Sequence, residues 1–168
     1  LVGMKIGGKE VFQRLLAGMK NDKGVHVESL LCALGALAGY ACQAGLRVQA
    51  ISQQLAENVL FLVVTDTEGK EYFFGDPLNR RLAETPDSVW SIAASAAQEA
   101  GCKTLPDIQD IFRYVTDTVG DSRFGLPRFP EGHNSGDTPA NYLKVLWPVF
   151  LPVAEKYCAG SEEWHVLF

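Results

Sequence analysis

The pattern of apolar and polar positions predicts a mainly helical chain. Apolar side chains recur three and four positions apart through residues 9–19, as on one face of an amphipathic helix. Residues 26–44 are apolar nearly all round, so we expect a buried central helix that ends at Gly45. Its leucines are expected to be almost fully buried, in particular Leu31, Leu34 and Leu37.

Small side chains lie along the same predicted helix, and its interior contains Gly35 and Gly39. Each glycine costs a helix about 1 kcal/mol relative to alanine. Close approach of another backbone would offset that cost. We therefore expect Leu at position 39 to overpack the contact and to destabilise the fold.

A β-hairpin is predicted in the middle of the chain. Residues 59–64 form a β-rich run that is apolar on both faces, and residues 71–74 form a second run after a turn at 66–69. An all-apolar run indicates that the first strand is buried. Residues 46–57 fit a helix or a strand equally well, and partial alternation in residues 164–168 favours a short strand.

Three further helices are expected in the second half of the chain. Their predicted starts are Thr85-Pro86, Pro106 and Thr138-Pro139, because proline is favoured in the first helical turn. Pro148 and Pro152 should kink or divide the last helix. The predicted fold is therefore α+β and mainly helical. It has five or six helices around a buried central helix, a small antiparallel hairpin or sheet, and a single globular domain over residues 1–168.

Composition and charge exclude several classes of partner. The 168 residues are 47% hydrophobic and 21% charged, which is typical of globular domains. The net charge of −5, without a basic run, argues against nucleic acid as a partner. The longest apolar stretch, residues 30–44, is short for a bilayer span, and the first residues lack a secretory pattern. We expect a cytoplasmic protein that does not enter a membrane.

The four cysteines are too scattered for a disulfide framework or a zinc site. None forms a CxxC pair, and no histidine lies near any of them in sequence. We interpret them as free, mostly buried thiols, and we expect neither a metal nor another cofactor.

Three short motifs resemble functional sites only in part. Residues 3–9 fit G-x-x-x-x-G-K, but Glu10 replaces the Ser or Thr of a phosphate-binding loop and no strand precedes it, so we interpret a flexible lead-in. Residues 132–136 place a serine one position away from that of G-x-S-x-G, which favours a polar turn. His26 and Glu28 could be two metal ligands, but the helical run behind them favours a first helical turn.

The best candidate site is the irregular stretch of residues 121–137. Long ordered loops in compact domains are uncommon and often functional. This one holds polar side chains that could bind a ligand: Arg123, Arg128, Glu131, His133 and Asp137. An imidazole with a carboxylate can act as base and orienter, and arginines can clamp a carboxylate or phosphate. We expect this stretch to border the protein's pocket.

No complete catalytic motif is present, so function stays open between classes. The working hypothesis is a non-catalytic domain that binds a small-molecule ligand or a partner and self-associates as a homo-oligomer. The alternative is a hydrolase or metal-assisted hydrolase that uses His133 and Asp137 with Glu131 or His26. A third possibility is a structural subunit of a larger assembly.

Overall fold

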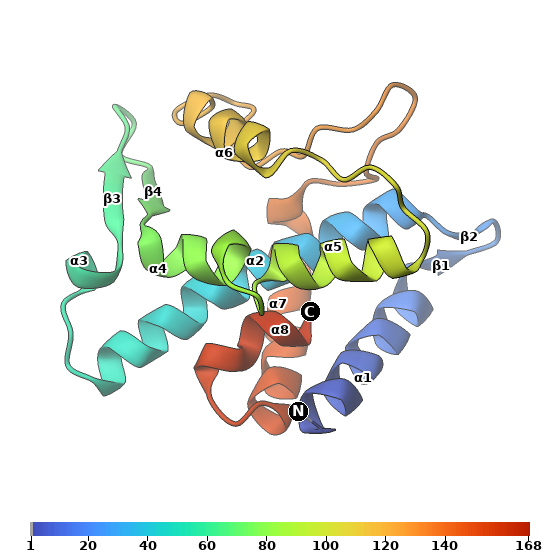
Figure 1. Ribbon diagram of the computed structural model, residues 1–168, viewed down its shortest axis with the longest axis horizontal. Helices are drawn as coiled ribbons and strands as arrows, with labels where there is room; N and C mark the ends of the chain where they lie inside the picture. The colour runs from blue at the N-terminus through green and yellow to red at the C-terminus, as the bar shows by residue number, and fades with distance from the viewer. Residues whose placement is uncertain (1) are drawn as a thin grey trace. The chain divides into compact units, whose positions relative to one another are not determined.

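The chain is mainly helical with two antiparallel hairpins, as predicted (Figure 1). A computed structural model describes residues 2–168. It divides into unit 1, which runs up to Gly45 and resumes at Leu126–Phe168, and unit 2, which comprises Leu46–Gly125. Helix α2 (Val27–Ser52) begins in unit 1 and ends in unit 2. The single domain expected from the sequence stays a prediction.

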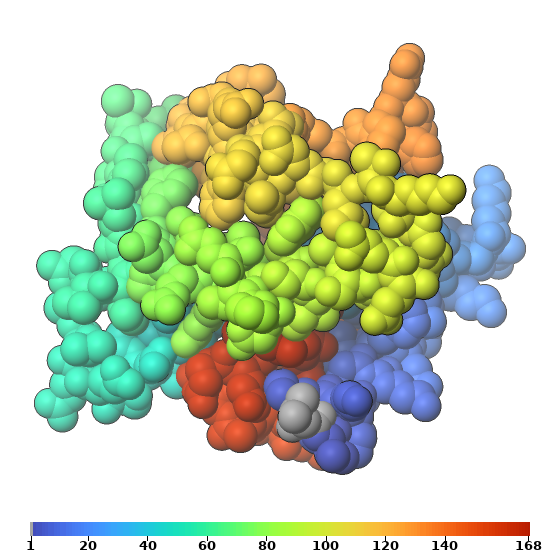
Figure 2. Space-filling view, viewed as in Figure 1, coloured from blue at the N-terminus to red at the C-terminus, as the bar shows by residue number. Residues whose placement is uncertain are grey.

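Unit 1 is a small helical bundle. Helix α1 packs against α7 and α8, and α7 packs against α8 (Figure 1). Its elements are α1 (Val2–Met19), β1 (Lys20–Asn21), β2 (Gly24–Val25), the first part of α2, α7 (Pro139–Tyr157), a 3₁₀ turn (Ser161–Glu163) and α8 (Trp164–Leu167). Its buried core is formed by Val11, Leu15, Leu30, Leu37, Ala41, Phe150, Val153, Ala154, Trp164 and Leu167. The β1–β2 hairpin projects from its surface (Figure 2).

The N-terminal glycines lie inside α1, so the flexible lead-in was a wrong interpretation. Helix α1 begins at Val2 and continues through Gly3 and Gly7. A Cβ atom at Gly7 would come within 2.7 Å of Leu167 Cδ1 and of Tyr157 Cβ. These glycines therefore allow close helix packing, and the helical backbone does not form a phosphate-binding loop.

Helix α2 is longer than predicted and buries a different face. It passes through Gly45 and ends at Ser52, which resolves most of the ambiguous segment as helix. Leu37 is fully buried and Leu34 half-buried, but Leu31 is 62% exposed, so that prediction was wrong for Leu31. The burial follows Leu30, Ala33, Leu37 and Ala41 at helical spacing, and Leu31 lies about 100° from Leu30.

The prediction that a larger side chain at Gly39 would overpack a contact was also wrong. A Cβ atom at Gly39 or at Gly35 would meet nothing within 4 Å. The small residues of α2 therefore do not bring another backbone into contact at these two positions.

Unit 2 combines the end of α2 with a hairpin and short helices. Its elements are α3 (Glu57–Leu60), β3 (Leu62–Thr65), β4 (Glu71–Phe74), α4 (Asp76–Asn79), a π-helical turn (Arg80–Glu84), α5 (Val89–Glu99) and α6 (Ile108–Asp117). The predicted hairpin is confirmed from Leu62 onward, with Leu62 opposite Phe74 and Thr65 opposite Glu71. Val59 and Leu60, which were predicted as strand, belong to α3, so the predicted start of the strand was wrong. The first strand of the hairpin is exposed at every residue, so the buried strand was a wrong prediction.

Helix ends agree with the sequence in part. Thr138 is the N-cap of α7, as predicted, and its Oγ accepts from the Asn141 N–H at 3.3 Å. Helix α5 begins at Val89, and its N-cap is Ser88 rather than the predicted Thr85, because the Ser88 hydroxyl accepts from the Ser91 N–H. Helix α7 passes undivided through its two exposed prolines. The C-terminal residues form α8 instead of the strand favoured by their alternation.

Candidate functional site

The predicted site residues fall in both units. The stretch between α6 and α7 contains no helix or strand, as predicted. Arg123 lies in unit 2, whereas Arg128, Glu131, His133 and Asp137 lie in unit 1. Arg128 and Glu131 are exposed. The two parts are therefore described separately.

Arg123 forms a local ion pair. Its Nη2 donates to Asp121 Oδ2 at 2.7 Å, and its Nε contacts both carboxylate oxygens at 3.1 Å. The hydrogen bonds from the Arg123 side chain and backbone lower the pKa of Asp121 to about 2. The guanidinium charge is thus compensated within the loop, which leaves it poorly suited to clamp an anionic ligand.

Asp137 lies immediately before Thr138, the N-cap of α7. Its Oδ1 accepts from the Thr138 N–H and from the Asn141 Nδ2, both at 2.7 Å. The Asn141 hydrogen bond, followed by that from Thr138, lowers the pKa of this carboxyl group. In residues 2–168 no hydrogen bond joins Asp137 to His133, so the structure does not bring the proposed catalytic pair together.

His133 instead contacts the first turn of α2. Its Nδ1 hydrogen-bonds to Glu28 Oε1, and the other carboxylate oxygen of Glu28 lies 3.5 Å from His26 Nε2. The His133 hydrogen bond is the main cause that lowers the pKa of Glu28. A carboxylate held between two imidazoles is therefore present, formed by residues more than 100 positions apart.

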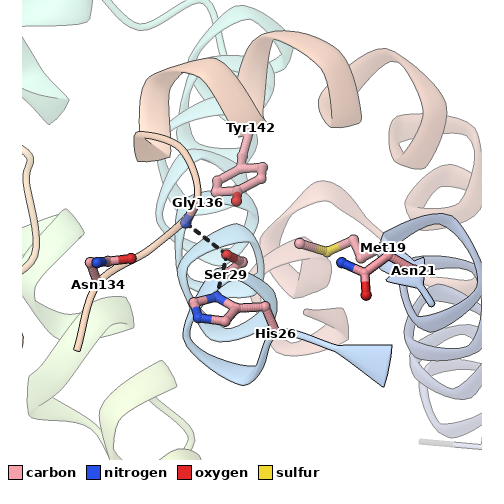
Figure 3. A pocket seen from close by; sticks show the side chains of 7 residues that line it. All are labelled: Met19, Asn21, His26, Ser29, Asn134, Gly136 and Tyr142. Carbon is pink, nitrogen blue, oxygen red and sulfur yellow. Dashed lines mark hydrogen bonds between the residues drawn. The ribbon is translucent and has the colours of Figure 1, made fainter. Parts of the chain in front are cut away.

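Ser29 connects this cluster to the segment before α7. It is only 5% exposed, and its Oγ lies 2.8 Å from His26 Nδ1 (Figure 3). The same Oγ accepts from the Gly136 N–H at 2.8 Å, so it joins the His26 ring to the segment before α7.

An open pocket of about 420 Å³ lies beside this cluster. It is lined by Met19, Asn21, His26, Ser29, Asn134, Gly136 and Tyr142 (Figure 3). Position 136 suits glycine, because a Cβ atom there would lie 3.1 Å from Ser29 Oγ and 3.5 Å from Tyr142 Oη. Asn134 and Gly136 come from the stretch that was expected to border a pocket.

A second open pocket, of about 510 Å³, lies within unit 2. It is lined by residues 58–63 and 75–77 and includes none of the predicted site residues. This second pocket lies beside the first residues of β3, because Leu62 and Val63 are part of its lining.

Other candidate features stay inconclusive. Within residues 2–168, no group of three or more His, Cys, Asp or Glu side chains is arranged to hold a metal ion. The cysteines are free, as predicted, but only Cys42 is buried and Cys102 is exposed, so the expectation of mostly buried thiols was wrong. Burial raises the pKa of the Cys158 thiol to about 11. Helix α2 is long and apolar enough to cross a membrane by length and composition, a test that buried core helices also pass. The expected cytoplasmic location stays a prediction.

The sequence alone did not identify Ser29, Asn21 or Tyr142 as pocket residues. One local signal was present for Ser29. It lies three positions after His26, which precedes α2, and this is the spacing at which side chains at a helix start contact each other. Tyr142 gave no such signal, because its place depends on how α7 packs. Neither a protein-family model nor a curated protein nor a solved structure matches this chain.

Proposed function

We propose that unit 1 binds a small anionic ligand, of the carboxylate class, in the pocket beside Ser29. The observation that supports this most is the character of the lining. Asn21, Asn134 and Tyr142 offer hydrogen-bond donors, and none of the seven lining residues carries a carboxylate. The volume of about 420 Å³ is in the range of small-ligand sites.

Two helix starts add positive potential at the same place. His26 and Ser29 lie at the first turn of α2, and Gly136 and Tyr142 lie on either side of the start of α7. The first N–H groups of a helix lack partners within the helix and favour negative charge. At α7 the Asp137 carboxylate and the Thr138 hydroxyl already accept from two of the N–H groups, so α2 contributes the larger part. The Glu28 carboxylate does not line the pocket, and its oxygens contact His133 and His26 instead.

The lining also gives the ligand a defined size. Met19 is the one aliphatic side chain among the seven, so it can contact a short carbon chain while the amides and the phenol bind polar groups. We therefore expect a compact ligand such as a short mono- or dicarboxylate.

Calorimetric titration tests the proposal with acetate, succinate and inorganic phosphate, and with neutral succinamide as the matched control. The proposal predicts saturable binding of succinate and none of succinamide. Tyr142→Phe should weaken binding several-fold. Tyr157→Phe is the matched variant on the same helix, because that phenol donates to Glu10 at 2.8 Å outside the pocket. Equal binding of succinate and succinamide would contradict the assignment of ligand class.

A second candidate function is acyl transfer, favoured by one observation. Ser29 Oγ lies 2.8 Å from His26 Nδ1, and Glu28 lies 3.5 Å from the other ring nitrogen, the order of contacts of an activated nucleophile. This replaces His133 and Asp137 as the catalytic pair. Since Ser29 is buried, the segment with Gly136 would have to move before a substrate reached Oγ.

Labelling with a fluorophosphonate and hydrolysis of p-nitrophenyl acetate test the second candidate. Labelling that is lost in both Ser29→Ala and His26→Ala would support acyl transfer. Labelling that persists in Ser29→Ala would exclude Ser29 as the nucleophile.

Self-association is retained as part of the proposal. Exposed apolar side chains on α7, namely Val145 at 69% and Val149 at 50%, lie one helical turn apart and offer a surface for it. Light scattering across a range of protein concentrations tests self-association, and a monomer mass that stays constant up to high concentration would contradict it.

A further inference from the structure

Strand β3 of unit 2 presents an exposed apolar edge. All four of its residues are exposed, with Leu62 at 65%, Val63 at 37% and Val64 at 39%. Figure 1 shows β3 beside β4, its partner in a two-stranded sheet. Among residues 2–168 no other strand pairs with β3. Exposed apolar edges of this kind are templates for pairing with another chain.

The register shows which backbone groups face outward. Asp66 N–H donates to Lys70 C=O at 3.0 Å, and these residues continue the register in which Val64 lies opposite Tyr72. In antiparallel pairs, hydrogen-bonded and non-hydrogen-bonded positions alternate. Residues 62, 64 and 66 therefore bond inward, and the N–H and C=O groups of Val63 and Thr65 point to the open edge.

An apolar groove adjoins the start of this edge. The second pocket, of about 510 Å³, is lined by Val59, Leu60, Phe61, Leu62 and Val63, together with Asn58, Gly75, Asp76 and Pro77. Extended peptides that add to a sheet edge gain affinity from main-chain bonds and specificity from such side-chain sites. The open edge of β3 and the groove beside it are separate observations, and both suit an extended peptide.

The charge of the hairpin region indicates whether the β3 edge binds a second copy of this chain or a different polypeptide. Residues 57–77 contain five carboxylates, Glu57, Asp66, Glu68, Glu71 and Asp76, against Lys70 alone. Arg47 of α2 pairs with Glu57 at 2.8 Å, so the other four carboxylates still leave an excess of negative charge. The backbone hydrogen bond from Lys70 is the largest cause that lowers the pKa of Asp66, so this group stays ionised. Two copies paired along β3 would bring like charges together, whereas a cationic segment would be attracted.

We infer that the outer edge of β3 binds an extended, cationic polypeptide segment of alternating apolar and basic residues as a third strand. Val63 and Thr65 supply the main-chain bonds, and the groove from Val59 to Val63 receives apolar side chains. The inference concerns unit 2 and does not depend on the proposed function of the pocket in unit 1.

Fluorescence anisotropy of a labelled heptapeptide that alternates valine and lysine tests this, with the full chain at about 150 mM salt to screen weak ionic attraction. The matched control is the same peptide N-methylated at every residue, which keeps all side chains and charges but loses the amide donors. We expect saturable binding of the first peptide and at least about tenfold weaker binding of the second. Equal affinities would show ionic attraction alone and overturn the inference, as would no binding at millimolar peptide.

Two variants of the protein complete the test. Thr65→Pro removes an outward N–H that β4 does not use, and Thr65→Ala keeps it. We expect Thr65→Pro to weaken peptide binding by about tenfold and Thr65→Ala to leave it within about twofold. Unchanged binding to Thr65→Pro would overturn the inference. If Thr65→Pro disturbs the hairpin, the comparison of the two peptides on the unaltered chain decides.

Discussion

The hydroxyl of Ser29 lies 2.8 Å from Nδ1 of His26 and accepts the Gly136 N–H at the same distance. Ser29 is thereby the junction between the first turn of α2 and the segment that enters α7. Since it is buried, the contact supports the fold of unit 1 as well as the pocket.

Ser29→Ala should lower the free energy of unfolding by about 1 kcal/mol, because the Gly136 N–H and the His26 ring each lose a partner. Urea denaturation followed by circular dichroism measures this. Ser52→Ala is the control, since the exposed Ser52 hydroxyl donates only to Gln49 C=O at the end of α2. An equal effect of both substitutions would contradict the role assigned to Ser29.

Glu28 should make stability depend on pH in the acid range. Its folded pKa lies below the ordinary value of 4.5, chiefly because His133 hydrogen-bonds to it. The carboxylate therefore contributes stability that is present above the unfolded pKa and is lost as pH falls through the folded pKa. Glu28→Gln should flatten the decline in the unfolding midpoint below about pH 4.5, compared with the unaltered chain. If the unfolding midpoint of Glu28→Gln falls with pH as steeply as that of the unaltered chain, Glu28 does not contribute to the acid dependence.

Gly7 and Gly18 form a matched pair within α1. A Cβ atom at Gly7 would come within 2.7 Å of Leu167 and Tyr157, whereas one at Gly18 would meet nothing within 4 Å. Gly7→Ala should therefore destabilise by about 1–3 kcal/mol through overpacking. Gly18→Ala should stabilise by up to about 1 kcal/mol through helix propensity. Thermal melts of the two variants compare them, and a stabilised Gly7→Ala would refute the close packing of α1.

Leu37 and Leu31 test which face of α2 is buried. Leu37→Ala should cost about 2–5 kcal/mol, since Leu37 is fully buried in the core of unit 1. Leu31→Ala should stay within about 0.5 kcal/mol, because Leu31 is 62% exposed. Chemical denaturation gives both values. A large loss at Leu31 would mean that this face is covered in solution.

Local sequence patterns predicted whether a segment is a helix or a strand better than they predicted which of its residues are buried. The hairpin turn at Asp66, the cap at Thr138 and the helix that follows Pro106 are set by neighbouring residues, and each was predicted. The exposure of β3 was not predicted, because an all-apolar run does not reveal whether another element covers it. The predicted burial of Leu31 was wrong for the same reason, because a helix that is apolar on all sides does not show which face packs inward.

The candidate site was predictable only in part. The hydrogen bond of Asp137 with Thr138 and the ion pair of Arg123 with Asp121 are local uses of charges that the sequence had suggested for a ligand. The contact of His133 with Glu28 links residues more than 100 positions apart, which no spacing rule could indicate. Asn134 and Gly136 do line a pocket, but its other residues are His26, just before α2, and residues of α1, β1, α2 and α7.

The central claim is that the pocket beside Ser29 binds a small carboxylate. Amide chemical shifts recorded during a succinate titration, with succinamide as the control, test it most directly. The account predicts saturable shifts for the amides of Ser29, Asn134 and Gly136, and none with succinamide. Absence of shifts at these residues at millimolar succinate, or equal shifts with succinamide, would contradict it.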